Sequence, residues 1–300
     1  MTGTRTITGG HPIVSALTFY GTRLKHPGQE RIHSWLRSRL AIDVDAAFDV
    51  ERSGLKWRLN PHDFIQRNLF WFGEYDRWDF HHFASFAKPG CTVFDVGANF
   101  GYYSLAIAAR LHRQCRIYAF EPFPQTFALL DHHVRTNGFG GVVIPVDVAL
   151  TDSAGEAVIH EWCGTEQNSG AASLAAGADS KGISLKPAGS VRVNTLDAVV
   201  GEYGLTSLEL MKIDVEGVEE RVLRGGQRTL NELRPVILIE LHRRQLLREG
   251  SSPERLKEIF EAAGYSLRAV ERDRLVPLRQ LPGDGQYVNA FAIPRERALF

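Results

Sequence analysis

The feature that most constrains the fold is the stretch from residue 92 to 104, a short apolar run followed by a turn with two glycines. Residues 93–96 combine β-branched and aromatic side chains, which is typical of a strand buried on both faces of a parallel sheet. Gly97 and Gly101 allow a sharp turn and the close approach of a ligand, and the apolar spacing of residues 102–110 predicts a helix. The stretch therefore predicts a strand, a turn and a helix that hold a nucleotide-like ligand.

Strands and helices are predicted to alternate along the rest of the chain. Strands are expected over residues 115–120, 142–148, 208–213, 236–240, 265–270 and 287–293, and helices over 125–136, 195–200, 218–230 and 253–263. Residues 157–162 suit an antiparallel arm, and residues 191–194 resume a strand. Strand and helix at this short spacing indicate a doubly wound parallel sheet.

The first 88 residues are predicted to form an N-terminal extension, with the main domain at residues 89–300. The extension has an amphipathic pattern over residues 32–40 and alternation typical of a strand over residues 55–59. Residues 64–86 are rich in aromatic side chains and are predicted to form one helix. These aromatic side chains either pack in a core or line a ligand site.

Between about Cys163 and Ser190 the composition changes to Gly, Ala and Ser, with few large apolar residues. This composition predicts a long loop or a lid over the site.

The 300 residues carry equal numbers of basic and acidic side chains, so net charge gives no argument for a nucleic acid or an anionic membrane as partner. The start of the chain is polar, and no apolar run approaches the ~20 residues that span a bilayer. We therefore expect a cytoplasmic protein without a membrane span. The three cysteines lie far apart and form no disulfide or zinc pattern. The oligomeric state stays open.

Glu121 lies about twenty residues beyond Gly101, a spacing at which an acidic side chain can accept hydrogen bonds from ribose hydroxyls. The same residue could equally be a turn or cap residue. The glycines form D-x-G-x-x-x-G rather than G-x-G-x-x-G, so the sequence does not favour a dinucleotide.

Several segments, taken in order over residues 70–242, carry a family resemblance. They are Val93-Phe-Asp-Val-Gly-Ala-Asn-Phe-Gly-Tyr-Tyr-Ser104, Ala119-Phe-Glu-Pro122, Ala149-Leu-Thr-Asp152, Lys212-Ile-Asp-Val-Glu-Gly-Val-Glu219 with Val222-Leu-Arg-Gly225, and Arg234-Pro-Val-Ile-Leu-Ile-Glu240. Together they resemble the FkbM-type family of S-adenosylmethionine-dependent methyltransferases. The resemblance implies an α/β, Rossmann-like class I methyltransferase fold, in which a seven-stranded, mostly parallel sheet ends in an antiparallel strand.

The resemblance also implies which residues bind the cofactor S-adenosylmethionine. They are Asp95 and Asn99 for its amino or carboxylate groups, Gly97 and Gly101 for close approach of the backbone, Glu121 for the ribose diol, Asp147 for the adenine amine, and Glu74 in the lead-in segment. A strand-end residue such as Asp147 is also often a solvated turn residue.

Candidate catalytic residues follow the fourth and fifth strands of the predicted sheet, where open α/β sheets bind substrate. They are Asp214, Glu216, Glu240 and His242. His242 has a suitable ordinary pKa to accept a hydroxyl proton, and Asp214 or Glu240 could orient it or bind the acceptor. Alternatively, Glu216 only favours the N-terminus of the next helix and His242 is a loop residue.

These inferences favour an O-methyltransferase that acts on a hydroxyl of a small metabolite such as a sugar, a polyketide-like compound or a glycolipid precursor. A nicotinamide-dependent oxidoreductase and a non-catalytic cofactor-binding protein are the alternatives. Three carboxylates and a histidine could also hold a divalent metal, but their spacing does not require one and a metal is not favoured.

Overall fold

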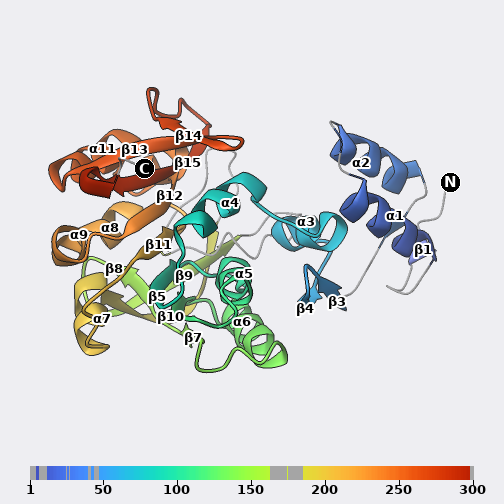
Figure 1. The fold of residues 1–300 in the computed structure, drawn as a ribbon, viewed down its shortest axis with the longest axis horizontal. Helices are drawn as coiled ribbons and strands as arrows, with labels where there is room; N and C mark the ends of the chain where they lie inside the picture. The colour runs from blue at the N-terminus through green and yellow to red at the C-terminus, as the bar shows by residue number, and fades with distance from the viewer. Residues whose placement is uncertain are drawn as a thin grey trace. The chain divides into compact units, whose positions relative to one another are not determined.

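The structure is a computed structural model that describes residues 5–6, 12–24, 26, 28–39, 42–43, 47–162, 174 and 185–297. The chain divides into two compact units (Figure 1). Residues 1–77 make up most of the first unit, and residues 78–164 and 170–300 make up the second.

The described residues of the first unit form three helices and four short strands. They are β1 (Arg5–Thr6), α1 (Pro12–Arg23), α2 (Gln29–Arg39), β2 (Ile42–Asp43), β3 (Phe48–Arg52), β4 (Leu55–Leu59) and α3 (Phe64–Phe72). The strand predicted over residues 55–59 is confirmed as β4, and the helix predicted over residues 32–40 lies mostly in α2.

The prediction of one helix over residues 64–86 is wrong. The helix α3 ends at Gly73, which takes a left-handed conformation with φ of 73°, and a second helix, α4 (Arg77–Phe86), begins four residues later. A left-handed residue cannot continue an α-helix, so the aromatic side chains are divided between two helices.

The second unit is built on an eight-stranded sheet with the order β14-β13-β15-β12-β11-β5-β6-β7 (Figure 1). In chain order its strands are β5 (Cys91–Val96), β6 (Cys115–Phe120), β7 (Val143–Val146), β11 (Leu210–Ile213), β12 (Val236–His242), β13 (Tyr265–Glu271), β14 (Arg274–Pro277) and β15 (Tyr287–Pro294). The strand β15 runs antiparallel to both of its neighbours, whereas the five strands from β12 to β7 are parallel.

The expected seven-stranded sheet with an antiparallel last strand is therefore confirmed. The strand β14 forms an additional antiparallel edge beside β13 that the sequence analysis did not predict.

Helices connect and cover the strands of this sheet. After α4 they are α5 (Tyr102–Arg110), α6 (Pro124–Thr136), α7 (Leu196–Glu202), α8 (Glu219–Arg224), α9 (Gln227–Glu232), α10 (Arg243–Arg248), α11 (Pro253–Ala262) and the 3-10 turn η2 (Arg295–Arg297). The single helix predicted over residues 218–230 is wrong, because Gly225 and Gly226 separate α8 from α9. A Cβ atom on Gly225 would lie 2.1 Å from the carbonyl oxygen of Thr151, so the chain passes this carbonyl group at a distance that only glycine allows.

A second, three-stranded sheet has the order β8-β10-β9. Its strands are β8 (Ala149–Thr151), β9 (Gly155–Trp162) and β10 (Leu185–Thr195). The antiparallel arm predicted over residues 157–162 is confirmed. The strand predicted over residues 142–148 is confirmed as the shorter β7, and β8 is a separate strand that begins beyond the predicted range, at Ala149. Residues 185–190 of the predicted loop form part of β10; residues 163–173 and 175–184 lie outside the described residues.

The candidate site lies at the edge of the large sheet that is formed by the carboxyl ends of its parallel strands. From β5 the chain continues to β6 on one side, and it later returns to β11 on the other side of β5. Open α/β sheets bind ligands at such a reversal of strand order, beyond the carboxyl ends of the strands. The sheet at this point is buried, with Phe94, Phe120, Ile213 and Ile239 fully enclosed.

Candidate functional site at the carboxyl edge of the sheet

The turns after β5 and β11 are in direct contact. Gly97 follows β5 with φ of 80°, and a Cβ atom there would lie 1.8 Å from the carbonyl oxygen of Asp214. The backbone N–H of Asp214 in turn donates a hydrogen bond to the carbonyl oxygen of Val96 at 3.0 Å. Gly97 therefore brings two segments that lie far apart in the sequence into contact at the reversal of strand order.

Gly101 has a different structural role. It has φ of 92°, and a Cβ atom there would lie 2.6 Å from Cδ1 of Leu130 and 2.8 Å from Cδ1 of Leu105. The left-handed φ strains any residue with a side chain at this position, and the ends of two leucine side chains from α5 and α6 pack against it. The approach of a ligand to its backbone stays a prediction.

Asp95 is buried near the end of β5. Its Oδ2 atom accepts a hydrogen bond from the Ser104 hydroxyl at 2.7 Å, and its Oδ1 atom has no hydrogen-bond partner among the described residues. Burial raises the pKa of Asp95, while the positive charge of Lys212 opposes the increase. A buried acceptor of this kind is suited to a charged donor from a ligand.

Glu121 joins the turns after β5 and β6. Its Oε2 atom accepts the backbone N–H of Asn99 at 2.8 Å. Its Oε1 atom accepts the backbone N–H of Phe123 at 2.9 Å and the hydroxyl of Thr126 at 2.7 Å. Burial raises the pKa of Glu121, and these hydrogen bonds oppose the increase. Since a carboxylate oxygen can accept two hydrogen bonds, Oε2 retains acceptor capacity for a ligand hydroxyl.

The other two residues assigned to the cofactor have different surroundings. Asp147 follows β7 at the same edge of the sheet, is exposed, and forms an ion pair with Arg192 of β10. Glu74 belongs to the first unit, where its carboxylate lies 3.8 Å from Arg77. The cofactor contacts of both residues stay predictions.

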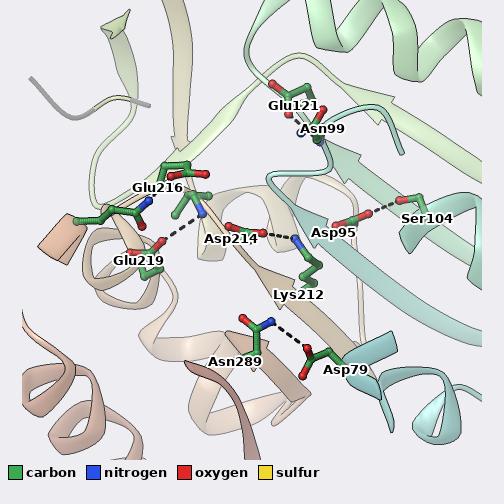
Figure 2. A network of polar contacts seen from close by, with 12 residues as sticks. Asp79, Asp95, Asn99, Ser104, Glu121, Lys212, Asp214, Glu216, Glu219 and Asn289 are labelled. Carbon is green, nitrogen blue, oxygen red and sulfur yellow. Dashed lines mark hydrogen bonds and ion pairs between the residues drawn. The ribbon is translucent and has the colours of Figure 1, made fainter. Parts of the chain in front are cut away.

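A buried lysine lies among the candidate catalytic carboxyl groups. Lys212 of β11 directs its Nζ atom to Oδ2 of Asp214 at 2.9 Å (Figure 2). The Asp214 side chain is 36% exposed, so it can contact both the lysine and a bound molecule.

The loop after β11 is fixed from two sides. Gln245 donates a hydrogen bond to Oε2 of Glu216, and Arg248 donates one to the Glu216 carbonyl oxygen at 2.9 Å. On the other side, Oε1 of Glu219 accepts the backbone N–H groups of Val215 at 3.2 Å and Gly217 at 3.1 Å. Glu216 has φ of 58°, an unfavourable conformation for a residue with a side chain, so these bonds stabilise a strained turn.

Burial raises the pKa of both glutamates in this loop. The pKa of Glu216 rises to about 8, with the charges of Asp214 and Glu219 adding to the effect of burial. The pKa of Glu219 rises to about 7, and its Oε2 atom is buried without a hydrogen-bond partner among the described residues. Both side chains are therefore able to hold a proton near neutral pH.

Glu240 and His242 lie in the last part of β12, but they have different partners. Burial and the charge of Asp214 raise the pKa of Glu240 well above its ordinary value. His242 stacks on Tyr287 with ring centroids 5.8 Å apart, and its Nδ1 atom accepts the N–H of Gln245 at 3.5 Å. Within the described residues, no hydrogen bond or ion pair joins His242 to Asp214 or Glu240. Burial lowers the pKa of His242, so the imidazole is neutral near pH 7.

Sequence analysis assigned no role to Lys212 or to a contact between Asp79 and Asn289. Asn289 of β15 pairs in register with Glu240 and donates a hydrogen bond to Asp79 of α4 at 3.1 Å (Figure 2). Lys212 is the one charged side chain of β11, but its signal in the sequence is weak because the strand predicted over residues 208–213 also contains Glu209. The Asp79 contact joins positions 210 residues apart, and the sequence contains no local signal for it.

The described residues are also informative about metal binding and about membrane-spanning helices. In the part of the chain that the structure describes, no group of three or more His, Cys, Asp or Glu side chains has an arrangement suited to a metal ion. None of the helices formed by the described residues combines the length and apolar character needed to cross a membrane.

Comparison with known proteins identifies the family. Residues 95–267 match the model of the methyltransferase FkbM domain. The chain is similar to AMB antimetabolite synthetase AmbE of Pseudomonas aeruginosa, with 25% identity over 84% of this chain and 12% of the synthetase. It is also similar to the hexuronic acid methyltransferase AglP of Haloferax volcanii, with 26% identity over 63% of this chain and 69% of AglP.

A third relative is the 31-O-demethyl-FK506 methyltransferase FkbM of Streptomyces tacrolimicus, with 30% identity over 46% of this chain and 60% of that protein. The chain thus spans 12% of the length of the synthetase and 60% of the length of the third relative. The family model covers more than half of the chain, including the end of β5, the glycine turn, Glu121 and the loop after β11. The chain belongs to the FkbM methyltransferase family.

Proposed function

We propose that this protein is an S-adenosylmethionine-dependent O-methyltransferase that acts on a hydroxyl group of a small metabolite. The observation that carries the proposal is the contact between Gly97 and the backbone of Asp214. It brings the turn assigned to the methyl donor and the carboxylate assigned to the acceptor to the same point on the sheet edge. Methyl transfer by in-line displacement requires this kind of alignment.

The residues at this edge fit the proposed cofactor. Its ammonium and sulfonium groups are positively charged, and carboxyl groups such as Asp95 and Asp214 line the edge. Oδ1 of Asp95 is a buried acceptor without a protein partner among the described residues, and Oε2 of Glu121 can accept one further hydrogen bond. When bound, S-adenosylmethionine supplies an electrophilic methyl group.

We assign Asp214 to the acceptor hydroxyl. Its carboxylate is partly exposed and is held by Lys212, so it can accept a hydrogen bond from the hydroxyl and take its proton. His242 is neutral near pH 7, which also allows it to accept a proton. We assign Glu240 to binding of the acceptor. The raised pKa of Glu216 makes it a weaker candidate for the base that acts at neutral pH, because it holds its own proton.

The names of the relatives support a hydroxyl acceptor. AglP is named as a methyltransferase of a hexuronic acid, and FkbM as one that acts on 31-O-demethyl-FK506. Sugars, polyketide-like compounds and glycolipid precursors all present secondary hydroxyl groups. We propose this group of compounds as acceptors.

A screen with methyl-labelled S-adenosylmethionine tests the proposal. Hydroxyl compounds of the three classes are incubated with the protein, and label in the product is measured. Asp214→Ala should abolish transfer and leave the cofactor dissociation constant within a few-fold, whereas Asp284→Ala in an exposed loop should change neither. Unchanged turnover in Asp214→Ala would remove Asp214 from the mechanism.

A further inference from the structure

Lys212 is an unusual residue in this sheet. It is 7% exposed, and it is the one lysine or arginine among the buried side chains that the structure describes. Its Nζ atom lies 2.9 Å from Asp214 and 5.2 Å from the centroid of the Tyr103 ring. A buried ammonium group is costly unless charges or hydrogen bonds compensate it, so its partners indicate its role.

We propose that Lys212 is a positioning residue for methyl transfer, because its buried ammonium group fixes the Asp214 carboxylate and supplies the positive charge that the surrounding carboxyl groups share. This inference rests on the proposed function only in its link to methyl transfer. The ion pair itself can be tested without any substrate.

The carboxyl groups around Lys212 lie on different elements of the sheet, which is the first support for the proposal. They come from three neighbouring parts of the sheet edge: Asp95 from β5, Glu216 from the loop after β11, and Glu240 from β12. The positive charge of Lys212 opposes the rise in pKa at each of these three groups, and the negative charge of Asp214 adds to it. The Lys212–Asp214 pair is therefore surrounded by carboxyl groups whose pKa is raised by burial.

Other charged groups do not replace Lys212 in this arrangement. Arg248 of α10 lowers the pKa of Glu216, whereas Lys212 lowers the pKa of Asp95, Glu216 and Glu240 alike. Glu219 of α8 adds a further negative charge that raises the pKa of both Glu216 and Glu240. Loss of the Lys212 charge would therefore leave the whole cluster without a shared cation.

The second support is that the main chain and the side chain of Asp214 are held separately. Gly97 packs against its carbonyl group, Val96 accepts its N–H, and Lys212 holds its carboxylate. A proton acceptor in a displacement reaction must keep its position to within a fraction of an ångström. Lys212 provides the last of these restraints.

The functional part is tested with Lys212→Met, which keeps the length of the side chain and removes its charge. We expect kcat to fall about 100-fold, which is the scale of a misplaced reacting group. The acidic limb of the pH–rate profile should move to higher pH, because the carboxylate loses the cation that favours its ionised form. Lys257→Met, at an exposed ion pair with Glu261 in α11, is the matched control and should leave the profile unchanged.

Kd for S-adenosylhomocysteine, measured by calorimetry, should change by no more than about threefold in Lys212→Met, because the loss lies in positioning rather than in uniform binding. A loss of kcat that is equal at every pH, with an unmoved acidic limb, would overturn the proposal. So would a loss of binding that accounts for the whole decrease in activity.

The ion pair is tested separately by a double-mutant cycle on thermal unfolding with Lys212→Met, Asp214→Asn and the double variant. Removing one partner of a buried pair leaves an uncompensated charge, so the double variant should melt at a higher temperature than Lys212→Met. This variant also provides folded protein if Lys212→Met does not fold. If the loss of melting temperature in the double variant equals the sum of the losses in the two single variants, the ion pair would be overturned. If the losses of melting temperature are not additive but the wild-type protein transfers no methyl group in the screen, the ion pair stands and only the proposed function is contradicted.

Discussion

Gly97 is the residue whose replacement should disturb the site most. An alanine there must adopt φ near 80° and place its Cβ atom where the Asp214 carbonyl oxygen lies, 1.8 Å away. We predict that Gly97→Ala lowers the free energy of unfolding by roughly 3–5 kcal/mol, combining left-handed strain with a forced backbone shift. Urea unfolding followed by circular dichroism measures the change.

Gly90 provides a matched control in the same unit. It has φ of 86°, and a Cβ atom there would meet nothing within 4 Å. Gly90→Ala should therefore lose only the strain of the left-handed conformation, about 1–2 kcal/mol. Equal losses in the two variants would show that the contact with Asp214 does not restrict this position.

Glu219 should make the stability of the protein depend on pH. Its pKa is about 7 in the folded protein, whereas an unfolded glutamate has a pKa of about 4.3. Between these values the folded state binds more protons than the unfolded state, so the free energy of unfolding decreases as pH rises. Glu219→Gln keeps a carbonyl acceptor for the N–H groups of Val215 and Gly217 but cannot titrate.

In the wild type, the free energy of unfolding should decrease as pH rises from about 4.5 to 7. We predict that Glu219→Gln makes this decrease smaller by up to about 1.4 kcal/mol per pH unit. Urea unfolding at a series of pH values measures it, and Glu261→Gln on the exposed face of α11 serves as the control. A slope identical to that of the wild type would contradict the folded-state pKa of Glu219.

Sequence reasoning identifies site residues where a strand ends in a polar side chain. Asp95 and Asp214 were found in this way because apolar runs define the strands before them. Lys212 was given no role, because the burial of its side chain depends on β5 and β12, which flank it only in the folded sheet. The partners of His242 depend in the same way on α10 and β15.

At the level of elements, Glu121 holds the turn after β5 to the start of α6. We predict that Glu121→Ala lowers the free energy of unfolding by roughly 2–4 kcal/mol, since two buried donors and one partly buried donor lose their acceptor. It should also weaken the binding of S-adenosylhomocysteine in calorimetry. Asp147→Ala removes only an exposed ion pair and should change stability by less than about 1 kcal/mol. Similar stability losses in the two variants would contradict the structural role of Glu121.

The order and type of most elements of the sheet could be predicted, because buried strands and packed helices have distinct apolar spacing. Breaks within helices could not. Gly225 and Gly226 interrupt a continuous helical pattern because the chain there passes close to Thr151 and Leu196, residues that are distant in sequence. The edge strand β14 is short and only partly buried, so it has no strong apolar signal.

For the whole molecule, the matched family region belongs to the second unit except for residues 165–169. We propose that the preceding residues, 1–88 in the predicted division, form an extension to the methyltransferase domain. The helix α4 lies within that range, but all of it except Arg77 belongs to the second unit. There Asp79 accepts a hydrogen bond from Asn289, and Nε2 of His82 lies 2.9 Å from the Arg272 carbonyl oxygen. These contacts favour placing α4 with the sheet.

The central claim is that the sheet edge around Gly97 and Asp214 binds S-adenosylmethionine. Titration calorimetry of the full chain with S-adenosylmethionine, S-adenosylhomocysteine and NAD tests it most directly. We predict saturable binding of both sulfur nucleotides, weakened by Glu121→Ala, and no saturable binding of NAD. Tight binding of NAD with no heat from either sulfur nucleotide would contradict the claim.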